Sequence, residues 1–346
     1  MKSELEKLCQ SFISNRDAVG KAFRWDNGAL HTVCANIFCA RGETADTERL
    51  KECRRIIRDS TGFRSKFRSR KVRSILAAML SLEDKPEDRM AQANAYFRLL
   101  KRQFKGSEYL VLTAFLLADL ADQALTEEAI SCGKEIYARM NQQHRILTDK
   151  TDSVFAMLMA FSGKTAEELT GETEACYQAL TKKFSSGGAQ TAAQVLSMAG
   201  GTPEEKAQRV ADLYDALHEA EIKYGHSSEL APLAALSLAD TPLSVLTEEI
   251  KEADEFLKTQ KGFGGSKEAD RAQRAMYAVM IVSDQYAGTE QVNITVMTNT
   301  IDMLIAKQQA SRISFFMNLL QFAVNLLLEK KEQPEGEQKQ DDAPAE

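Results

Sequence analysis

The feature that most constrains the fold of this chain is an internal repeat of roughly forty residues. A large aromatic or aliphatic residue recurs on the first helix of each predicted unit, at intervals of 39, 41, 40, 37 and 42 residues. These positions are Ile57, Tyr96, Tyr137, Tyr177, Tyr214 and Phe256. Such a period is typical of stacked helix pairs, because one pair cannot bury its apolar stripe without its neighbours.

A hydroxyl residue ahead of each second helix repeats with nearly the same period, at intervals of 38, 41, 38, 41 and 39 residues. These residues are Ser69, Ser107, Thr148, Ser186, Ser227 and Ser266. Each side chain is predicted to accept a hydrogen bond from a first-turn amide and so to cap its helix. The first helices have their own start signals, which are Pro86 and the predicted capping boxes Thr165-x-x-Glu168 and Thr202-x-x-Glu205.

These patterns predict an all-α fold, an α-solenoid-like stack of about six helix pairs. A chain of 346 residues with 7% aromatic residues and 6 prolines agrees with helices joined by short turns. We expect an N-terminal helical cap at 1–44, helical-hairpin repeats at 45–288, C-terminal capping helices at 289–330 and a disordered acidic tail at 331–346. The alternative is a globular multi-helix bundle in which the periodicity is accidental.

The cysteines and the amino terminus both indicate a cytoplasmic protein. The first residues carry scattered charges and no apolar run before a cleavage site, so they do not resemble a secretory signal. The six cysteines contain no C-x-x-C pair and lie within apolar-periodic segments, which predicts buried free thiols rather than disulfides or a metal site. They are Cys9, Cys34, Cys39, Cys53, Cys132 and Cys176.

The most apolar segment is 313–328, near the carboxyl end. Its sixteen residues are fewer than the roughly twenty that a bilayer-spanning helix needs, so no transmembrane segment is predicted. Ser314, Asn318, Gln321 and Asn325 form one polar stripe along it. We expect a buried closing helix with one wet edge; an interfacial membrane helix is the alternative.

The strongest local anomaly is the basic segment 51–73, which has net charge +8 in a chain of net charge −6. Such a local positive field attracts phosphates or an acidic protein. Phe63 and Phe67 interleave with the basic residues, as base stacking requires. The candidate residues for an anionic partner are Arg54, Arg55, Arg58, Arg64, Lys66, Arg68, Arg70, Lys71 and Arg73.

A structural explanation of the same segment is a solvated face whose charges pair with acidic residues of adjacent repeats. Both phenylalanines would then lie in the core. The acidic total charge disfavours bulk nucleic-acid binding, for which a basic domain is the usual footprint.

A candidate metal or proton-transfer site is formed by His144, Asp149 and Asp152. An imidazole and two carboxylates are suitable ligands, but the sequence supplies no further one. The two aspartates also suit the amino-terminal dipole of a following helix, which is the structural alternative. No phosphate-binding, dinucleotide-binding, nucleophile-elbow or zinc-protease motif occurs, so we predict no cofactor.

Several phrases of the repeats resemble a bacterial family known only as a domain of unknown function, DUF4003. The phrases are Phe63-Arg64-Ser65, Tyr96-x2-Leu99-x4-Phe104-x2-Ser107-x-Tyr109-Leu110 and His144-x2-Leu147-Thr148-x3-Asp152. The resemblance spans about residues 5–325. It implies a bacterial, cytoplasmic setting and brings no activity, ligand or partner.

The leading functional hypothesis is a non-catalytic scaffold that binds a protein or peptide on its concave surface. The second is a binder of an anionic ligand, either nucleic acid or a phosphorylated partner, through segment 51–73. The third is a metal-dependent enzyme that uses His144, Asp149 and Asp152.

Overall fold

The structure is a computed structural model, and it describes residues 3–26, 28–70, 72–118, 127–148, 152–160, 164–227, 229–263 and 269–286. These residues form fourteen α-helices and one short 3-10 helix, η1 (Lys66–Arg68), with no strand among them. The predicted all-α class is confirmed.

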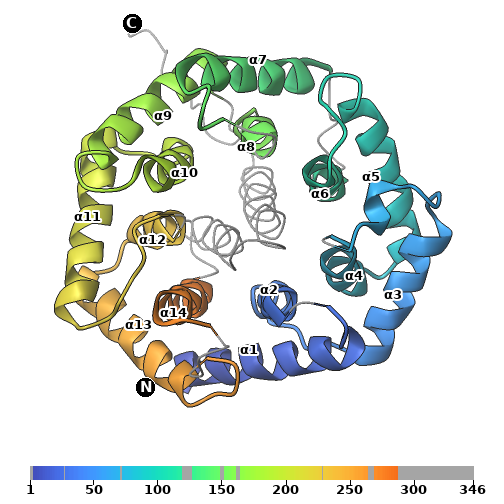
Figure 1. Ribbon diagram of the computed structural model, residues 1–346, viewed down its shortest axis with the longest axis horizontal. Coiled ribbons are helices and arrows are strands. Elements are labelled where there is room, and N and C mark those ends of the chain that lie inside the picture. The colour runs from blue at the N-terminus through green and yellow to red at the C-terminus, as the bar shows by residue number, and fades with distance from the viewer. Residues whose placement is uncertain are drawn as a thin grey trace, which may run out of the picture.

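Odd-numbered and even-numbered helices form two concentric layers (Figure 1). The outer layer consists of α1 (Ser3–Ala22), α3 (Thr47–Asp59), α5 (Pro86–Leu100), α7 (Glu127–Gln143), α9 (Ala166–Leu180), α11 (Pro203–Glu219) and α13 (Leu243–Lys258). The inner layer consists of α2 (Gly28–Cys39), α4 (Arg73–Ser81), α6 (Glu108–Leu117), α8 (Asp152–Met159), α10 (Ser186–Ser197), α12 (Leu230–Ser237) and α14 (Arg271–Gln285). The inner helices are seen end-on in this view, so they run side by side along the axis of the molecule.

The first and last described helix pairs contact each other, so the molecule is a closed ring (Figure 1). Helix α1 packs against α13 and α14, and α2 reaches α14. The ring of Phe12 lies 6.4 Å from that of Phe263 and 6.2 Å from that of Tyr277. Across the same seam, Arg16 Nη1 donates to the carbonyl of Lys261 over 2.7 Å. The described residues therefore form seven pairs, and the predicted solenoid-like stack of about six pairs is not confirmed.

The forty-residue period has a direct structural cause. All six predicted anchor residues lie on outer helices. A second set of rings lies in the connections from outer to inner helices and packs on the next outer helix. The ring pairs are Phe67–Phe97 at 5.4 Å, Phe104–Tyr137 at 6.3 Å, His144–Tyr177 at 4.4 Å, Phe184–Tyr214 at 5.1 Å and Phe263–Phe12 at 6.4 Å. Among the described residues, a ring–ring contact thus joins neighbouring pairs at five of the seven junctions.

The predicted starts of the outer helices are confirmed. Helix α5 begins at Pro86, and Thr165 and Thr202 each form a capping box with the glutamate three residues later. In both boxes the threonine hydroxyl accepts a backbone N–H and the glutamate accepts the N–H of the threonine. These bonds satisfy amides that the helix itself leaves unpaired.

The predicted hydroxyl caps of the inner helices are wrong at most positions. Only Ser107 accepts a first-turn amide, that of Leu110, over 3.2 Å. Thr148 instead donates to the carbonyl of Met140, and α10 and α12 have no side-chain cap. Beside the predicted position Ser186, the hydroxyl of Ser185 donates to the carbonyl of His226 in the next connection. Of the remaining positions, Ser69 follows η1 and Ser186 is the first residue of α10. At Ser227 the backbone carbonyl, not the hydroxyl, accepts the N–H of Leu230. Ser266 lies outside the described residues.

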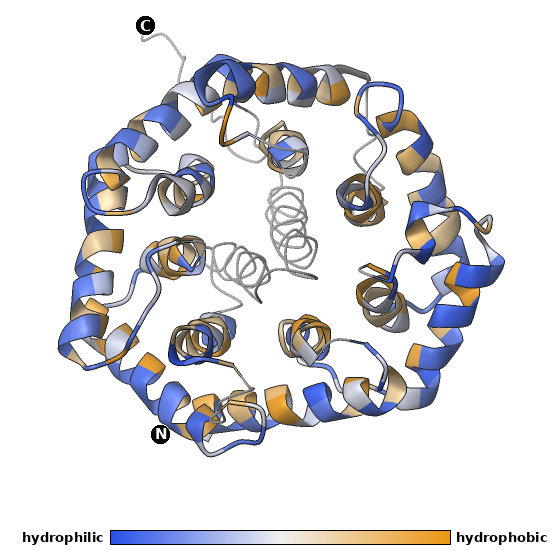
Figure 2. Cartoon of the chain, viewed as in Figure 1, coloured by the Kyte–Doolittle hydropathy of each residue, from blue (hydrophilic) through white to orange (hydrophobic). Residues whose placement is uncertain are grey.

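The core lies between the two layers and among the inner helices. Inner helices are predominantly apolar, whereas hydrophilic residues cover much of the outer helices (Figure 2). Helix α12 is buried along its whole length, because it has neighbours on both sides and an outer helix behind it. Where α10 approaches the next connection, a Cβ on Gly188 would lie 2.3 Å from the carbonyl oxygen of Ser227, so only glycine fits there.

Several predictions fall outside the described residues. These are the capping helices at 289–330, the tail at 331–346 and the environment of the apolar segment 313–328. The six cysteines are free thiols, as predicted; five are buried and Cys132 is half-buried. Within the described ranges, no helix combines the length and hydropathy that crossing a membrane requires.

Candidate anionic-partner interface

The ring has two chemically different faces. Every inner helix is entered through a connection from the preceding outer helix, and the inner helices run side by side, so these connections share one end of the ring. We call this end the entry face. Its described residues are 23–26, 60–70, 72, 101–107, 144–148, 181–185, 220–227, 229, 259–263 and 269–270. The connections from inner to outer helices define the opposite, exit face.

The entry face is strongly basic. Its described residues include thirteen lysines and arginines and four aspartates and glutamates. The described inner-to-outer connections carry three basic and five acidic residues. The outer helices that start at the exit face add glutamates in their first turns, among them Glu48, Glu87, Glu167 and Glu204. The negative net charge of the whole chain therefore does not reveal that the entry face is basic and the exit face is acidic.

Helix dipoles add to this polarity. All seven inner helices begin at the entry face, so the partial positive charges of their amino termini add to the field of the lysines and arginines. At the exit face, cations bind the carboxyl ends of inner helices. Arg209 Nη2 donates to the carbonyls of Ala239 and Thr241 over 2.8 and 2.7 Å, and Arg49 Nη2 donates to that of Glu83 over 3.0 Å.

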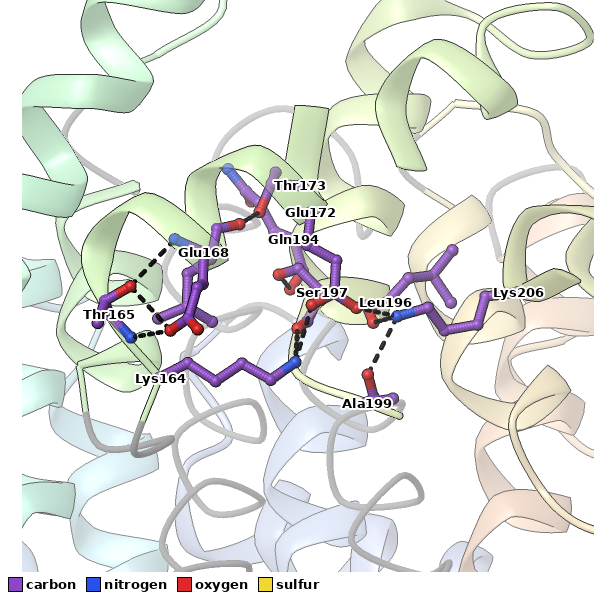
Figure 3. A network of polar contacts seen from close by, with 11 residues as sticks. Lys164, Thr165, Glu168, Glu172, Thr173, Gln194, Leu196, Ser197, Ala199 and Lys206 are labelled. Carbon is purple, nitrogen blue, oxygen red and sulfur yellow. Dashed lines mark hydrogen bonds and ion pairs between the residues drawn. The ribbon is translucent and has the colours of Figure 1, made fainter. Parts of the chain in front are cut away.

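The exit-face network in Figure 3 shows how these cations are held. Lys206, almost fully buried, donates to the carbonyls of Leu196 and Ala199 over 2.7 and 3.0 Å. It also pairs with Glu172, which in turn binds Lys164 over 2.8 Å. Lys206 and Lys164 of this face are therefore paired within the protein, unlike Arg64, Arg70 and Lys105 of the entry face.

Large apolar side chains are exposed on the entry face. In the described part of the chain, the exposed large hydrophobic residues are Trp25, Phe63 and Ile146, at 78%, 88% and 98% exposure. All three lie in outer-to-inner connections. Arg24 covers one face of the Trp25 ring at 4.7 Å. Apolar side chains amid basic ones are typical of interaction sites.

The basic segment 51–73 divides into paired and unpaired charges. Lys51 pairs with Glu48, Arg54 with Asp26, Arg58 with Asp59 and Lys66 with Glu108. Arg68 donates to the carbonyls of Thr61 and Arg58. Arg55, Arg64 and Arg70 are exposed and form no hydrogen bond or ion pair with a described residue; Lys71 lies outside that set. Phe67 is in the core, and Phe63 is not.

The unpaired charges extend beyond that segment. Phe67 packs on Phe97, and Lys66 lies 3.5 Å from Glu108, so connection 60–70 adjoins connection 101–107. The latter adds Lys101, Arg102 and Lys105, all exposed. These residues were not predicted from the sequence, and neither was the pair Lys182–Lys183, of which Lys183 forms an ion pair with Asp215. The signal that could have found them is a lysine or arginine beside the buried ring in most connections, as in Lys66-Phe67, Phe104-Lys105, Lys183-Phe184 and Lys223-Tyr224.

His144 and Asp152 have structural partners. His144 Nε2 lies 2.6 Å from Glu174 Oε2, and its ring occupies the position that an aromatic residue has in other units. Asp152 is buried and accepts hydrogen bonds from Gln194 over 2.7 Å and from Gln190 over 3.4 Å. Asp149 is outside the described residues, within which no three metal-ligating side chains cluster. The metal site stays a prediction.

Comparison with known proteins identifies a family. A family model described as "Protein of unknown function (DUF4003)" matches residues 15–310. No curated protein and no solved structure matches the chain.

Proposed function

Because the chain belongs to the DUF4003 family, whose description assigns no function, we propose a role from its surface: a cytoplasmic, non-catalytic scaffold whose entry face binds an acidic protein segment. The observation that carries this proposal is the coincidence of two features on one face. Thirteen basic residues against four acidic ones lie there together with Trp25, Phe63 and Ile146. Buried free thiols suit a reducing compartment.

Charge steers such a partner, and apolar contacts hold it. Long-range attraction from a basic surface raises the rate of encounter and falls with ionic strength. The exposed rings provide area that is desolvated on binding, which supplies most of the affinity in protein interfaces. A protein segment with both acidic and apolar residues satisfies both requirements.

Nucleic acid is the less favoured partner. A duplex presents phosphates over a long stretch, and the usual footprint of its binders is a basic domain. Here the chain has net charge −6, and its exit face is acidic. A protein segment short enough to remain on the entry face avoids that repulsion.

The test is binding of a fluorescent glutamate-rich peptide that contains leucine and phenylalanine, measured by anisotropy at two salt concentrations. We expect affinity to fall as salt rises. The variant Arg64→Glu/Arg102→Glu/Lys182→Glu changes three exposed residues of different units on the entry face and should weaken binding at least about tenfold.

The matched control is Arg55→Glu/Lys85→Glu/Lys251→Glu, which reverses three exposed charges outside the entry face. It should retain most of the affinity. Equal losses in the two variants would contradict the proposal. A twenty-base-pair DNA duplex that binds more tightly than the peptide would assign the surface to nucleic acid instead.

A further inference from the structure

Where the first two units meet on the entry face, Arg54 pairs with Asp26, and Arg73 interacts electrostatically with Arg54, Asp26 and Arg70. Arg54, on α3, lies 3.3 Å from Asp26 in the α1–α2 connection and 4.8 Å from the centre of the Phe23 ring. Ser74, in the first turn of α4, donates a hydrogen bond to the same carboxylate. Arg73 is the first residue of α4, and Arg70 precedes it by three positions.

The charges of this cluster do not balance. Among the described residues, Asp26 is the carboxylate that pairs with Arg54 and acts electrostatically on Arg73, and its side chain is 4% exposed. Burial lowers the pKa of Arg73, and the charges of Arg54 and Arg70 lower it further, while Asp26 opposes them. Within the described residues, the buried Nε of Arg73 has no hydrogen-bond partner. Three guanidinium groups against one carboxylate leave two excess positive charges, those of half-buried Arg73 and exposed Arg70, and this excess favours a bound anion.

The amount of excess positive charge in this cluster indicates which anion fits it. A carboxylate would neutralise one charge, whereas a phosphate monoester carries about −1.5 to −2 at neutral pH and has three acceptor oxygens. Guanidinium groups donate in a planar fork that matches phosphate oxygens. Val72 precedes α4 and has no side-chain oxygen that could cap its first-turn amides, so no capping side chain offsets the partial positive charge at the amino end of this helix.

We propose that Arg54, Arg70 and Arg73 form a binding site for the phosphoryl group of a phosphorylated side chain on the partner. This deepens the proposed function, because it names the group that the entry face recognises. Asp26, Ser74 and the Phe23 ring hold Arg54 in place before the ligand arrives, so little side-chain entropy is lost on binding.

The test compares two glutamate-rich peptides that differ only in a central phosphoserine or serine, by anisotropy at fixed ionic strength. The phosphorylated peptide should bind the wild-type chain at least about tenfold more tightly. Arg70→Gln and Arg73→Gln should each remove most of that preference. Arg55→Gln removes the same charge at an exposed position of α3 outside the entry face, so this variant should keep the preference for the phosphorylated peptide. Arg70 is exposed, so its variant folds even where Arg73→Gln does not.

A parallel measurement uses inorganic phosphate, which should raise the Tm above that in sodium chloride of equal ionic strength, except in Arg70→Gln. Equal affinity of the wild type for both peptides would overturn the site while leaving the proposed function standing. An equal loss of preference in Arg55→Gln would also overturn it. If the serine peptide fails to bind, but phosphate raises the Tm through Arg70, the site is supported and the proposed function fails.

Discussion

Neighbouring residues of similar chemistry have opposite roles in this ring. Phe63 and Phe67 lie four positions apart in one connection; Phe67 is fully buried against Phe97, and Phe63 is 88% exposed. The sequence predicts that aromatic and basic residues alternate here. It does not predict which ring is buried, because that depends on where the next outer helix passes.

Burial also determines which cysteine thiols of this protein are reactive. Burial raises the pKa of Cys53 and Cys176 to about 11 and that of Cys9 and Cys39 to about 12. Cys132 is half-buried. Because the thiolate is the reactive form, we expect one fast thiol in the native protein at pH 8 when Ellman's reagent is added. Cys132→Ser should abolish this fast phase; its persistence in the variant would show the prediction wrong.

The same pKa shifts make stability depend on pH. Above about pH 9 an unfolded chain loses thiol protons that the folded chain retains, so the free energy of unfolding falls as pH rises towards 11, by up to about 1.4 kcal/mol per pH unit for each buried thiol. Cys176→Ala removes one such group. Urea unfolding at pH 8, 9 and 10 should therefore show the wild type losing its advantage over this variant as pH rises. If the difference in unfolding free energy between the two proteins stays constant from pH 8 to pH 10, the raised pKa of Cys176 is wrong.

At the scale of elements, the sequence predicts correctly how the outer helices start, but it does not predict how the inner helices are capped. Thr165 and Thr202 cap exposed helix starts, where local bonds decide the outcome. The hydroxyl of Ser185 instead donates to a carbonyl of the next unit, and that of Thr148 donates to the carbonyl of Met140 in the preceding helix. The basic entry face was predictable only in part. Arg64 stands in a charge run, whereas Lys105 lies in the connection that adjoins that run and Lys183 lies on the same face three units further round the ring.

Lys206 should be the most important polar side chain of the exit face. Lys206→Met leaves the buried carbonyls of Leu196 and Ala199 without their donor and should cost about 3 kcal/mol in urea unfolding. Lys164→Met is the control, since this lysine is 37% exposed and also binds Glu172. We expect a cost of about 1 kcal/mol there. Equal costs would show that burial of Lys206 contributes little.

At the scale of the whole molecule, closure distinguishes this ring from an open stack. The N-terminal unit fits the repeat poorly by its anchor residue, yet its connection ring does follow the period. Rings stand at 23, 67, 104, 144, 184, 224 and 263, with intervals of 44, 37, 40, 40, 40 and 39 residues. Seven units could thus have been counted. Closure itself could not, because it depends on the small rotation between successive pairs.

The seam residue Phe12 tests closure. Phe12→Ala should cost about 3–5 kcal/mol, since the ring is fully buried against Phe263 and Tyr277. In hydrogen exchange the variant should lose protection in α13 and α14 as well as in α1. Faster exchange restricted to α1 and α2 is the behaviour of a terminal unit in an open stack, and would count against closure.

The central claim is that several units recognise an acidic protein segment on one face. Hydrogen–deuterium exchange with and without the glutamate-rich serine peptide tests it most directly. The predicted result is slower exchange in connections 60–70, 101–107 and 181–185, with no change in the exit-face connections 198–202 and 238–242. Protection of the exit-face connections, or of a single entry connection alone, would contradict the account.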